Sequence, residues 1–315
     1  MSDVASAHAR LSGRVIRTPL RRSEWLSRLI DADVWLKLEC VQLTGSFKIR
    51  GALNAAILHA ERHAGVPAPL VTASAGNHGR ALALAAEQIN VPLTVFVPEN
   101  APKTKIDAIR NHGATLVRER DYDAAEAAAR AYAEREGATF VSPYNDADVI
   151  AGAGTVALEV FDDLPEARTL VVPVGGGGLA SAIGLVCQAQ PGKVSMIGVE
   201  AEASQAFSVG LRAGRITTIT PLPTLADGLG GNLEGGSITF PLMQQVCDGI
   251  VTVSEDALGR AIAALVGEEH LVAEGAGAAA VAAIAERKAK SVDGAIVAIV
   301  SGSNIDLGKL VPLLR

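Results

Sequence analysis

Short runs of β-branched and aliphatic residues alternate with helical patterns almost from one end of this 315-residue chain to the other. The runs have the length and composition of strands, and the segments between them have the residue spacing of amphipathic or alanine-rich helices. The predicted strands are Val34–Leu38, Leu70–Ala73, Leu93–Val97, Thr115–Val117, Leu170–Val174, Val194–Val199, Ile250–Val253 and Ala295–Val300. The predicted helices are Phe47–Ala60, Asn77–Ile89, Thr104–Asn111, Tyr122–Glu136, Ala151–Asp162, Leu179–Gln190, Asp256–Glu269 and Ala276–Lys288. This alternation predicts an α/β fold built on parallel sheets with right-handed crossovers.

The composition agrees with buried parallel sheets. Apolar residues make up 49% of the chain and aromatic residues only 3%, so alanine and aliphatic side chains must form the core. A chain of this length predicts two domains. The polar segment from about residue 66 to residue 144 has strand and helix alternations of its own. We therefore predict a large domain formed by residues 1–64 and 145–315 and a smaller domain formed by residues 65–144.

Charge and cysteine content exclude several classes of protein. The net charge is −6 and no basic run is present, so nucleic acid is not an expected partner. The alanine-rich stretch Leu271–Ala285 contains Glu274 and is too short to cross a bilayer. Cys40, Cys187 and Cys247 match no metal-ligand spacing and are predicted to be buried thiols in a reducing compartment. With no signal-peptide pattern at the N-terminus, we expect a cytoplasmic protein that does not bind membranes.

Three strand-to-helix turns have unusual sequences. In parallel sheets, ligands bind beyond the carboxyl ends of the strands, so these turns are candidates for the functional site. They read S-A-G-N-H-G (Ser74 to Gly79), G-G-G-G-L-A (Gly175 to Ala180) and S-G-S-N (Ser301 to Asn304). Four consecutive glycines at the start of a helix allow backbone N–H groups to approach a phosphate closely.

Each of these turns also has an alternative interpretation. The glycine turn fits G-x-G-x-x-A, and Glu200 ends the next strand, which is the pattern of an NAD-dependent oxidoreductase. That function would leave Lys48 and the turn from Ser74 to Gly79 without a role. Ser74 can simply cap a helix, His78 can simply cap or pack, and the last turn can cap a helix that starts near Ile305.

The segment Q-L-T-G-S-F-K-I-R-G, from Gln42 to Gly51, places Lys48 directly after a small-residue turn and in the first turn of a predicted helix. The positive potential of a helix N-terminus disfavours the ammonium form, which moves the amine toward the free base that Schiff-base chemistry requires. The alternative is an ordinary surface lysine. The three turns described above favour the reactive lysine.

Together, seven segments of the chain resemble the fold type II family of pyridoxal phosphate enzymes, the serine/threonine dehydratases and serine racemases among them. They occur in family order over nearly the whole chain. The matching segments are Leu38–Ala52, Thr72–Ala83, Val149–Glu159, Val172–Leu179, Leu225–Leu229, Glu274–Ala278 and Ser301–Asn304. The resemblance implies a tryptophan synthase β-like fold with two domains, each with a mainly parallel twisted sheet covered by helices.

The resemblance also implies a role for each matching residue. Lys48 would form the Schiff base with pyridoxal 5′-phosphate and act as base on Cα of the bound amino acid. Phe47 would pack beside the pyridine ring, Asn77 would bind its 3′ oxygen, and Ser301 would meet its nitrogen. The phosphate would be held by backbone N–H groups of Gly175, Gly176, Gly177, Gly178 and Leu179. The substrate carboxylate would be framed by Ser74, Ala75, Gly76 and His78, and Ser74 would also occupy the place of the opposite-face acid/base of the racemases.

The reaction implied is β-elimination from a 3-hydroxy amino acid such as L-threonine or L-serine, which yields a 2-keto acid and ammonia. A serine opposite the pyridine nitrogen favours early loss of the β-leaving group. The alternatives are serine racemase, a dehydratase of 3-hydroxyaspartate or phenylserine, and a β-replacement synthase. The last usually continues K-D-R after its lysine, where this chain has Lys48-Ile49-Arg50. A protein that carries the cofactor without catalysis is disfavoured because Lys48, Ser74 and Ser301 are all present.

Two departures from the family pattern concern substrate and metal. Ala153 stands where the family commonly has glutamine, and a methyl group in place of the amide is expected to enlarge that part of the substrate site or make it drier. Metal-dependent members follow a strand-end glutamate with an aspartate about six residues later. Glu200 is followed only by Glu202, so no metal is predicted and Glu200 is a weak candidate ligand. With 11 residues after Asn304, no carboxyl-terminal regulatory domain is expected, and a homodimer is typical of the family.

Overall fold

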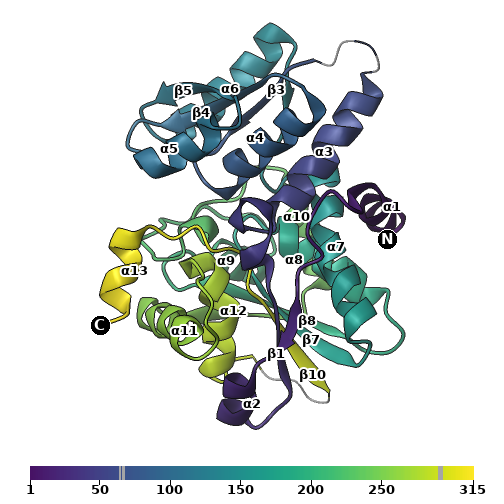
Figure 1. Ribbon diagram of the computed structural model, residues 1–315, viewed down its shortest axis with the longest axis vertical. Helices are drawn as coiled ribbons and strands as arrows, with labels where there is room; N and C mark the ends of the chain where they lie inside the picture. The colour runs from purple at the N-terminus through teal and green to yellow at the C-terminus, as the bar shows by residue number, and fades with distance from the viewer. Residues whose placement is uncertain (64, 66–67, 290–293) are drawn as a thin grey trace.

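The computed structural model describes residues 1–63, 65, 68–289 and 294–315, and it contains two separate sheets (Figure 1). The six-stranded sheet lies in the lower part of the view and the four-stranded sheet in the upper part. The fold predicted from the sequence, an α/β architecture of two mainly parallel sheets covered by helices, is confirmed.

The larger sheet has the strand order β1-β2-β10-β7-β8-β9, and only β1 runs antiparallel to its neighbour. Its strands are β1 (Leu20–Arg22), β2 (Val34–Lys37), β7 (Ala167–Pro173), β8 (Ser195–Ala201), β9 (Gly249–Val253) and β10 (Ala295–Ile299). The helices of this part of the molecule are α1 (Ser2–Leu11), α2 (Glu24–Ile30), α7 (Ala147–Asp163), α8 (Gly178–Gln188), α9 (Ala206–Ala213), α10 (Thr239–Val246), α11 (Glu255–Gly267), α12 (Gly275–Ala285) and α13 (Leu307–Leu313).

Both faces of this sheet are buried, which is why its strands are apolar without interruption. Along β10, Ile296 and Ala298 pack with α11 and α12, whereas Val297 and Ile299 pack with α7 and α8 on the opposite face. Successive side chains of a strand point to opposite faces, so a strand covered on both sides needs apolar residues at every position.

The smaller sheet is entirely parallel and has the order β5-β4-β3-β6. Its strands are β3 (Leu70–Ala73), β4 (Leu93–Pro98), β5 (Thr115–Glu119) and β6 (Thr139–Phe140). The helices beside it are α3 (Lys48–Arg62), α4 (Asn77–Ile89), α5 (Lys103–Arg110) and α6 (Tyr122–Glu136). Helix α3 shares an apolar cluster with this sheet, since Ile49 and Leu53 pack with Leu70 and Leu82.

All predicted strands and helices are present, with ends that differ by a few residues. The sequence analysis missed β1 and β6, which have three and two residues, and the helices α1, α2, α9 and α10. The two strands are too short for a periodic pattern. Helix α13 corresponds to the helix near Ile305 that the alternative interpretation of the last turn offered. The division into two domains stays a prediction, and its boundary at residue 64 lies outside the described residues.

Two predictions about composition can be checked directly. Cys40 and Cys187 are buried as expected, but Cys247 is only partly buried, because it lies at the end of α10 where the chain turns toward β9. Within the described ranges, no helix is long and apolar enough to cross a membrane.

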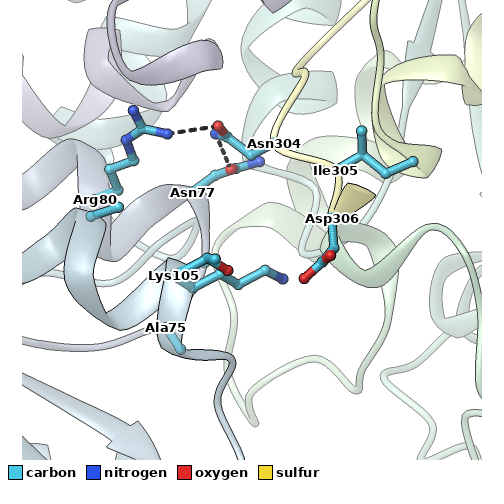
Figure 2. A pocket seen from close by; sticks show the side chains of 10 residues that line it. Ala75, Asn77, Arg80, Lys105, Asn304, Ile305 and Asp306 are labelled. Carbon is cyan, nitrogen blue, oxygen red and sulfur yellow. Dashed lines mark hydrogen bonds between the residues drawn. The ribbon is translucent and has the colours of Figure 1, made fainter. Parts of the chain in front are cut away.

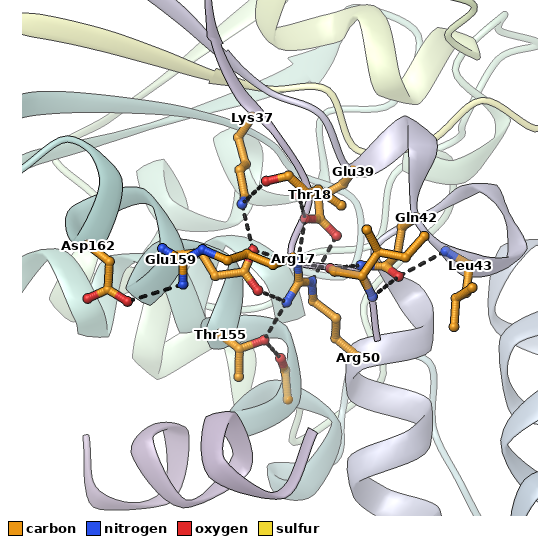
Figure 3. A network of polar contacts seen from close by, with 12 residues as sticks. Arg17, Thr18, Lys37, Glu39, Gln42, Leu43, Arg50, Thr155, Glu159 and Asp162 are labelled. Atoms are coloured by element: carbon orange, nitrogen blue, oxygen red, sulfur yellow. Dashed lines mark hydrogen bonds and ion pairs between the residues drawn. The ribbon is translucent and has the colours of Figure 1, made fainter. Parts of the chain in front are cut away.

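A fully buried ionic network joins α3 to β2 and α7 (Figure 3). Arg50 donates to both oxygens of Glu39, over 2.9 and 2.8 Å, and to Glu159 over 2.7 and 2.9 Å. Lys37 Nζ donates to Glu159 over 2.6 Å and to the Thr18 carbonyl over 2.7 Å. Two positive and two negative side chains therefore compensate one another, and together they fix the start of α3.

Two glycines let α3 and α7 cross closely. A Cβ atom at Gly152 would lie 2.4 Å from the Arg50 carbonyl oxygen, and one at Gly51 would lie 2.6 Å from that of Val149. Neither position can hold a larger residue without displacing backbone, so the place of α3 against α7 depends on both glycines.

Candidate active site

Lys48 is the first residue of α3, as the sequence predicts. Its Nζ donates to the Pro143 carbonyl over 2.7 Å and lies 5.1 Å from the centre of the Phe47 ring. Burial lowers the pKa of Lys48 to about 8, and the charge of Glu274 opposes this shift. An appreciable fraction of this amine is therefore unprotonated near neutral pH, and burial is the main cause of the lowered pKa.

The carboxyl end of β10 lies directly beside this lysine. The backbone N–H of Phe47 donates to the Ser301 carbonyl over 3.1 Å, and Ser46 forms an isolated bridge with Gly302. Ser301 itself is buried, with 4% of its surface exposed. The structure thus brings Phe47, Lys48 and Ser301 together, although more than 250 residues separate the two segments in sequence.

The glycine turn before α8 offers unused hydrogen-bond donors. Among the described residues, no backbone N–H from Gly175 to Ala180 donates to a protein acceptor. Gly177 has a φ of +84°, and a Cβ atom there would lie 2.5 Å from the Phe207 ring. At the N-terminus of an 11-residue helix, such donors fit a phosphate group.

Tyr144 covers this turn, which sequence reasoning did not foresee. A Cβ atom at Gly176 would lie 2.2 Å from Cγ of the Tyr144 ring, so only glycine fits beneath it. The Tyr144 hydroxyl accepts from the backbone N–H of Glu234 over 3.0 Å. Because Lys48 bonds to the adjacent Pro143, this segment connects the lysine with the glycine turn.

The turn from Ser74 to Gly79 is a second group of free donors. Among the described residues, the backbone N–H groups of Ala75, Asn77 and His78 donate to no protein acceptor. The Ser74 hydroxyl accepts from the Gly76 N–H over 3.3 Å, within its own turn. Helix α4 begins at Asn77 after Gly76, so Ser74 is not its cap.

His78 is buried, with 2% of its surface exposed, and its Nε2 lies 3.1 Å from the Val141 carbonyl oxygen. Burial and the nearby charge of Lys48 lower the pKa of His78 to about 3, so the ring is neutral. A neutral ring that donates from Nε2 has only an acceptor at Nδ1, and Nδ1 has no partner among the described residues. The side chain therefore cannot donate to a carboxylate, and a contact with one must use the His78 backbone N–H.

Glu274 is a site residue that the sequence analysis did not assign. Its carboxylate accepts from Asn77 Nδ2 over 2.5 Å, and its backbone N–H donates to the Gly302 carbonyl over 3.0 Å. Burial raises the pKa of Glu274, while the hydrogen bond from Asn77 opposes the shift. The only sequence signal was its position in Glu274–Ala278, one of the segments that match the family.

The remaining candidates lie elsewhere. Glu200 accepts from the backbone N–H groups of Phe207 and Ser208 over 2.7 and 2.9 Å, at the start of α9. The described residues contain no cluster of His, Cys, Asp and Glu that suits a metal ion. Ala153 is buried in the apolar cluster of α7 and α8. Ser303 donates to the Cys40 carbonyl over 2.7 Å, and Asp306, not a serine, caps α13.

A cavity of about 200 Å³ opens beside Asn77, between α4, α5 and the segment after β10 (Figure 2). From the turn before α4, Ala75, Gly76 and Asn77 line it, whereas Ser74 does not. A second cavity of about 240 Å³ shares Asn304 and Asp306 with the first and reaches Glu274. Small molecules thus have access to the side of the site that carries Asn77 and Glu274.

Comparison with known proteins places these features in a family. Residues 11–302 match the family described as "Pyridoxal-phosphate dependent enzyme". The chain is 42% identical to an L-threonine ammonia-lyase of Thermotoga maritima, over 98% of this chain and 77% of the relative. It is 36% identical to the catabolic L-threonine dehydratase of Escherichia coli, over 98% and 94%. The structure of maize serine racemase superposes with a TM-score of 0.91 at 32% identity, over 99% and 95% of the two chains.

Proposed function

This chain belongs to the pyridoxal-phosphate-dependent enzyme family, and on that premise we propose that it removes water from L-threonine or L-serine. The enzyme is an ammonia-lyase of the threonine/serine dehydratase type, and its cofactor is pyridoxal 5′-phosphate. The products are a 2-keto acid and ammonia. Within the site, the observation that carries the proposal is the amine of Lys48 at the start of α3, which donates to the Pro143 carbonyl and has a pKa of about 8.

The residues present fit the cofactor. The free N–H groups from Gly175 to Ala180 suit its phosphate, and the narrow space under Tyr144 explains why this turn needs glycine. Phe47 and Ser301 lie beside Lys48, where we place the ring and its nitrogen. Asn77 is assigned to the ring oxygen because its amide carries a second N–H besides the one that Glu274 accepts.

The substrate carboxylate is assigned to the second group of donors, at the start of α4. The free N–H groups of Ala75, Asn77 and His78 and the positive end of a 13-residue helix favour a negative group there. Ser74 and Gly76 complete this turn, and the Ser74 hydroxyl orients its backbone through Gly76.

Once bound, pyridoxal phosphate supplies the electron sink for the negative charge that develops on Cα. Lys48 Nζ takes the Cα proton, and the lowered pKa keeps a useful fraction of this amine unprotonated at neutral pH. The C–O bond at Cβ then breaks, and the departing hydroxide takes up the proton that Lys48 removed from Cα and leaves as water. The released enamine hydrolyses with one water to the keto acid and ammonia, so atoms and charge balance.

Racemization is the second candidate, since a serine racemase superposes closely. It requires a group that returns a proton to the face of Cα opposite Lys48. The resemblance assigns this role to Ser74, whose hydroxyl accepts from the Gly76 N–H within its own turn and still carries a proton. Measuring D-serine beside pyruvate from L-serine distinguishes the two activities.

The central test is chemical. The purified protein with cofactor is expected to be yellow, and borohydride is expected to fix the cofactor on Lys48, as read by peptide mass spectrometry. Lys48→Ala is expected to abolish both the label and the release of keto acid. A panel of L-threonine, L-serine, 3-hydroxyaspartate and phenylserine then ranks the substrates. Label on another lysine, or no keto acid from the whole panel, would refute the proposal.

We further propose that the enzyme is a cytoplasmic homodimer whose chain divides into the domains 1–64 with 145–315, and 65–144. The α13 region exposes three large apolar side chains to water, Leu307 at 70%, Val311 at 46% and Leu314 at 45%. A second copy of the chain would cover this apolar surface. Light scattering after gel filtration measures the mass in solution. A monomeric mass at micromolar concentration would contradict the dimer.

A further inference from the structure

A continuous chain of hydrogen bonds leads from the wall of the first cavity into the site (Figure 2). Arg80 Nη1 donates to Asn304 Oδ1 over 2.7 Å, and Asn304 Nδ2 donates to Asn77 Oδ1 over 2.7 Å. Asn77 Nδ2 in turn donates to Glu274 over 2.5 Å. These hydrogen bonds join α4, beside the four-stranded sheet, to the segment after β10 and to the start of α12, which belong with the six-stranded sheet.

In this series of hydrogen bonds, the order of donors and acceptors from Arg80 to Glu274 can run in only one direction. A guanidinium group donates and never accepts, so the oxygen of Asn304 must face Arg80. The NH₂ group of Asn304 must then face Asn77 and the Thr44 carbonyl, to which it donates over 2.8 Å. Asn77 consequently presents its oxygen to Asn304 and its NH₂ group to Glu274. A flipped amide at either asparagine would set two donors or two acceptors against each other.

We propose that Arg80, Asn304 and Glu274 are positioning residues that hold the Asn77 amide with its N–H groups toward the site. This inference rests on the proposed function, because it concerns the N–H of Asn77 that we assign to the ring oxygen of the cofactor. The residues act through Asn77. Their role is to keep a donor, and not an acceptor, against an oxygen that carries negative charge.

Arg80 is suited to this role because, among the described residues, its side chain has few hydrogen bonds other than the one to Asn304. Its Nε is buried and has no partner among the described residues, and its one side-chain hydrogen bond goes to Asn304. Asn304 is similarly committed, with both ends of its amide used. Both side chains line the cavity, so a change at Arg80 reaches Asn77 through one intermediate residue.

The test is the pH titration of the visible absorbance of the holoenzyme at rest. A hydrogen bond to the charged form of a group favours that form, so a weakened donor to the ring oxygen raises the midpoint. Arg80→Met and Asn304→Asp are expected to raise the midpoint by about 0.5–1 pH unit, in the direction of Asn77→Ala but by less. Asn304→Asp keeps the shape and the contact with Arg80 but cannot donate to Asn77, so it also serves if Arg80→Met folds poorly.

The matched control is Thr104→Val in the wall of the same cavity, because the Thr104 side chain makes no hydrogen bond among the described residues. It is expected to leave the midpoint unchanged. Arg80→Lys restores a donor and is expected to lie between Arg80→Met and the parent enzyme. Equal midpoints for Arg80→Met, Asn304→Asp and Thr104→Val would overturn the inference while leaving the proposed function intact. A parent protein with no visible absorbance would instead overturn the proposed function.

Discussion

Two polar networks near Lys48 differ in how completely they are paired. The closed network, formed by Lys37, Glu39, Arg50 and Glu159, is at most 3% exposed, and each charge meets an opposite charge. The open network, from Arg80 to Glu274, contains neutral amides, borders two cavities and leaves the Arg80 Nε donor unused among the described residues. The first has no spare capacity for a ligand and sets the position of α3, whereas the second can still bind one.

The largest loss in the free energy of unfolding is expected when one charge is removed from the closed network. Arg50→Met leaves Glu39 buried with the Thr18 hydroxyl as its remaining partner, and leaves Glu159 with Lys37 as its remaining cation. Removing one member of a buried ion pair typically costs about 3–5 kcal/mol. We expect a loss of this size in the free energy of unfolding, measured by urea titration. A loss below about 1 kcal/mol would mean that the network does not hold α3.

The influence of the open network on the site is tested by titrating Lys48 itself. In the apoenzyme, reductive methylation of Lys48 is expected to rise with pH around a midpoint of about 8, because burial lowers its pKa. Glu274→Gln removes a negative charge that raises this pKa, so the midpoint is expected to fall further. Mass spectrometry of the Lys48 peptide gives the rate, with the exposed Lys103 as the internal reference. A midpoint that rises in Glu274→Gln would contradict the assignment.

The two networks are also expected to respond to pH in opposite directions. Burial raises the pKa of Glu39, but the adjacent Arg50 outweighs this and lowers it overall, so its stabilisation is present above the unfolded value and lost as pH falls below about 4.3. The pKa of Glu274 is raised by burial, so its stabilisation is complete below about 4.3 and is lost as pH rises through the folded value.

Urea titrations of the apoenzyme between pH 3 and pH 8 measure both effects. Glu274→Gln is expected to remove the decline in stability on the rising side and to leave the acid side unchanged. An unchanged pH dependence on the rising side would show that Glu274 is not the responsible group.

The smallest effect is expected at the edge of the closed network. Arg17 pairs with Asp162 and Asp163, but its side chain is 50% exposed. Exposed ion pairs typically contribute about 0–1 kcal/mol. Arg17→Ala is expected to change the free energy of unfolding by less than about 1 kcal/mol in the same urea titration. A loss comparable with that of Arg50→Met would show that burial is not what separates these residues.

The sequence revealed the parts of the site that depend on local pattern. Lys48 at a helix start and the glycines from Gly175 to Gly178 follow from residue type and spacing, and the structure has them at the starts of α3 and α8. The contact between Asn77 and Glu274 joins residues 197 positions apart, and no local pattern encodes it. Tyr144 above Gly176 was missed for the same reason, because the tyrosine lies in a segment with no periodic signal.

The closed network also dictates an order of events as the chain emerges from the ribosome. Arg50 and Glu159, which share two hydrogen bonds, are 109 residues apart. Until α7 has been synthesised, Lys37 and Arg50 have one carboxylate between them, and Val149 and Gly152 are not there to meet α3. A nascent chain that stops before α7 is therefore expected to stay protease-sensitive in its first 60 residues or so, and to become resistant only when Glu159 arrives.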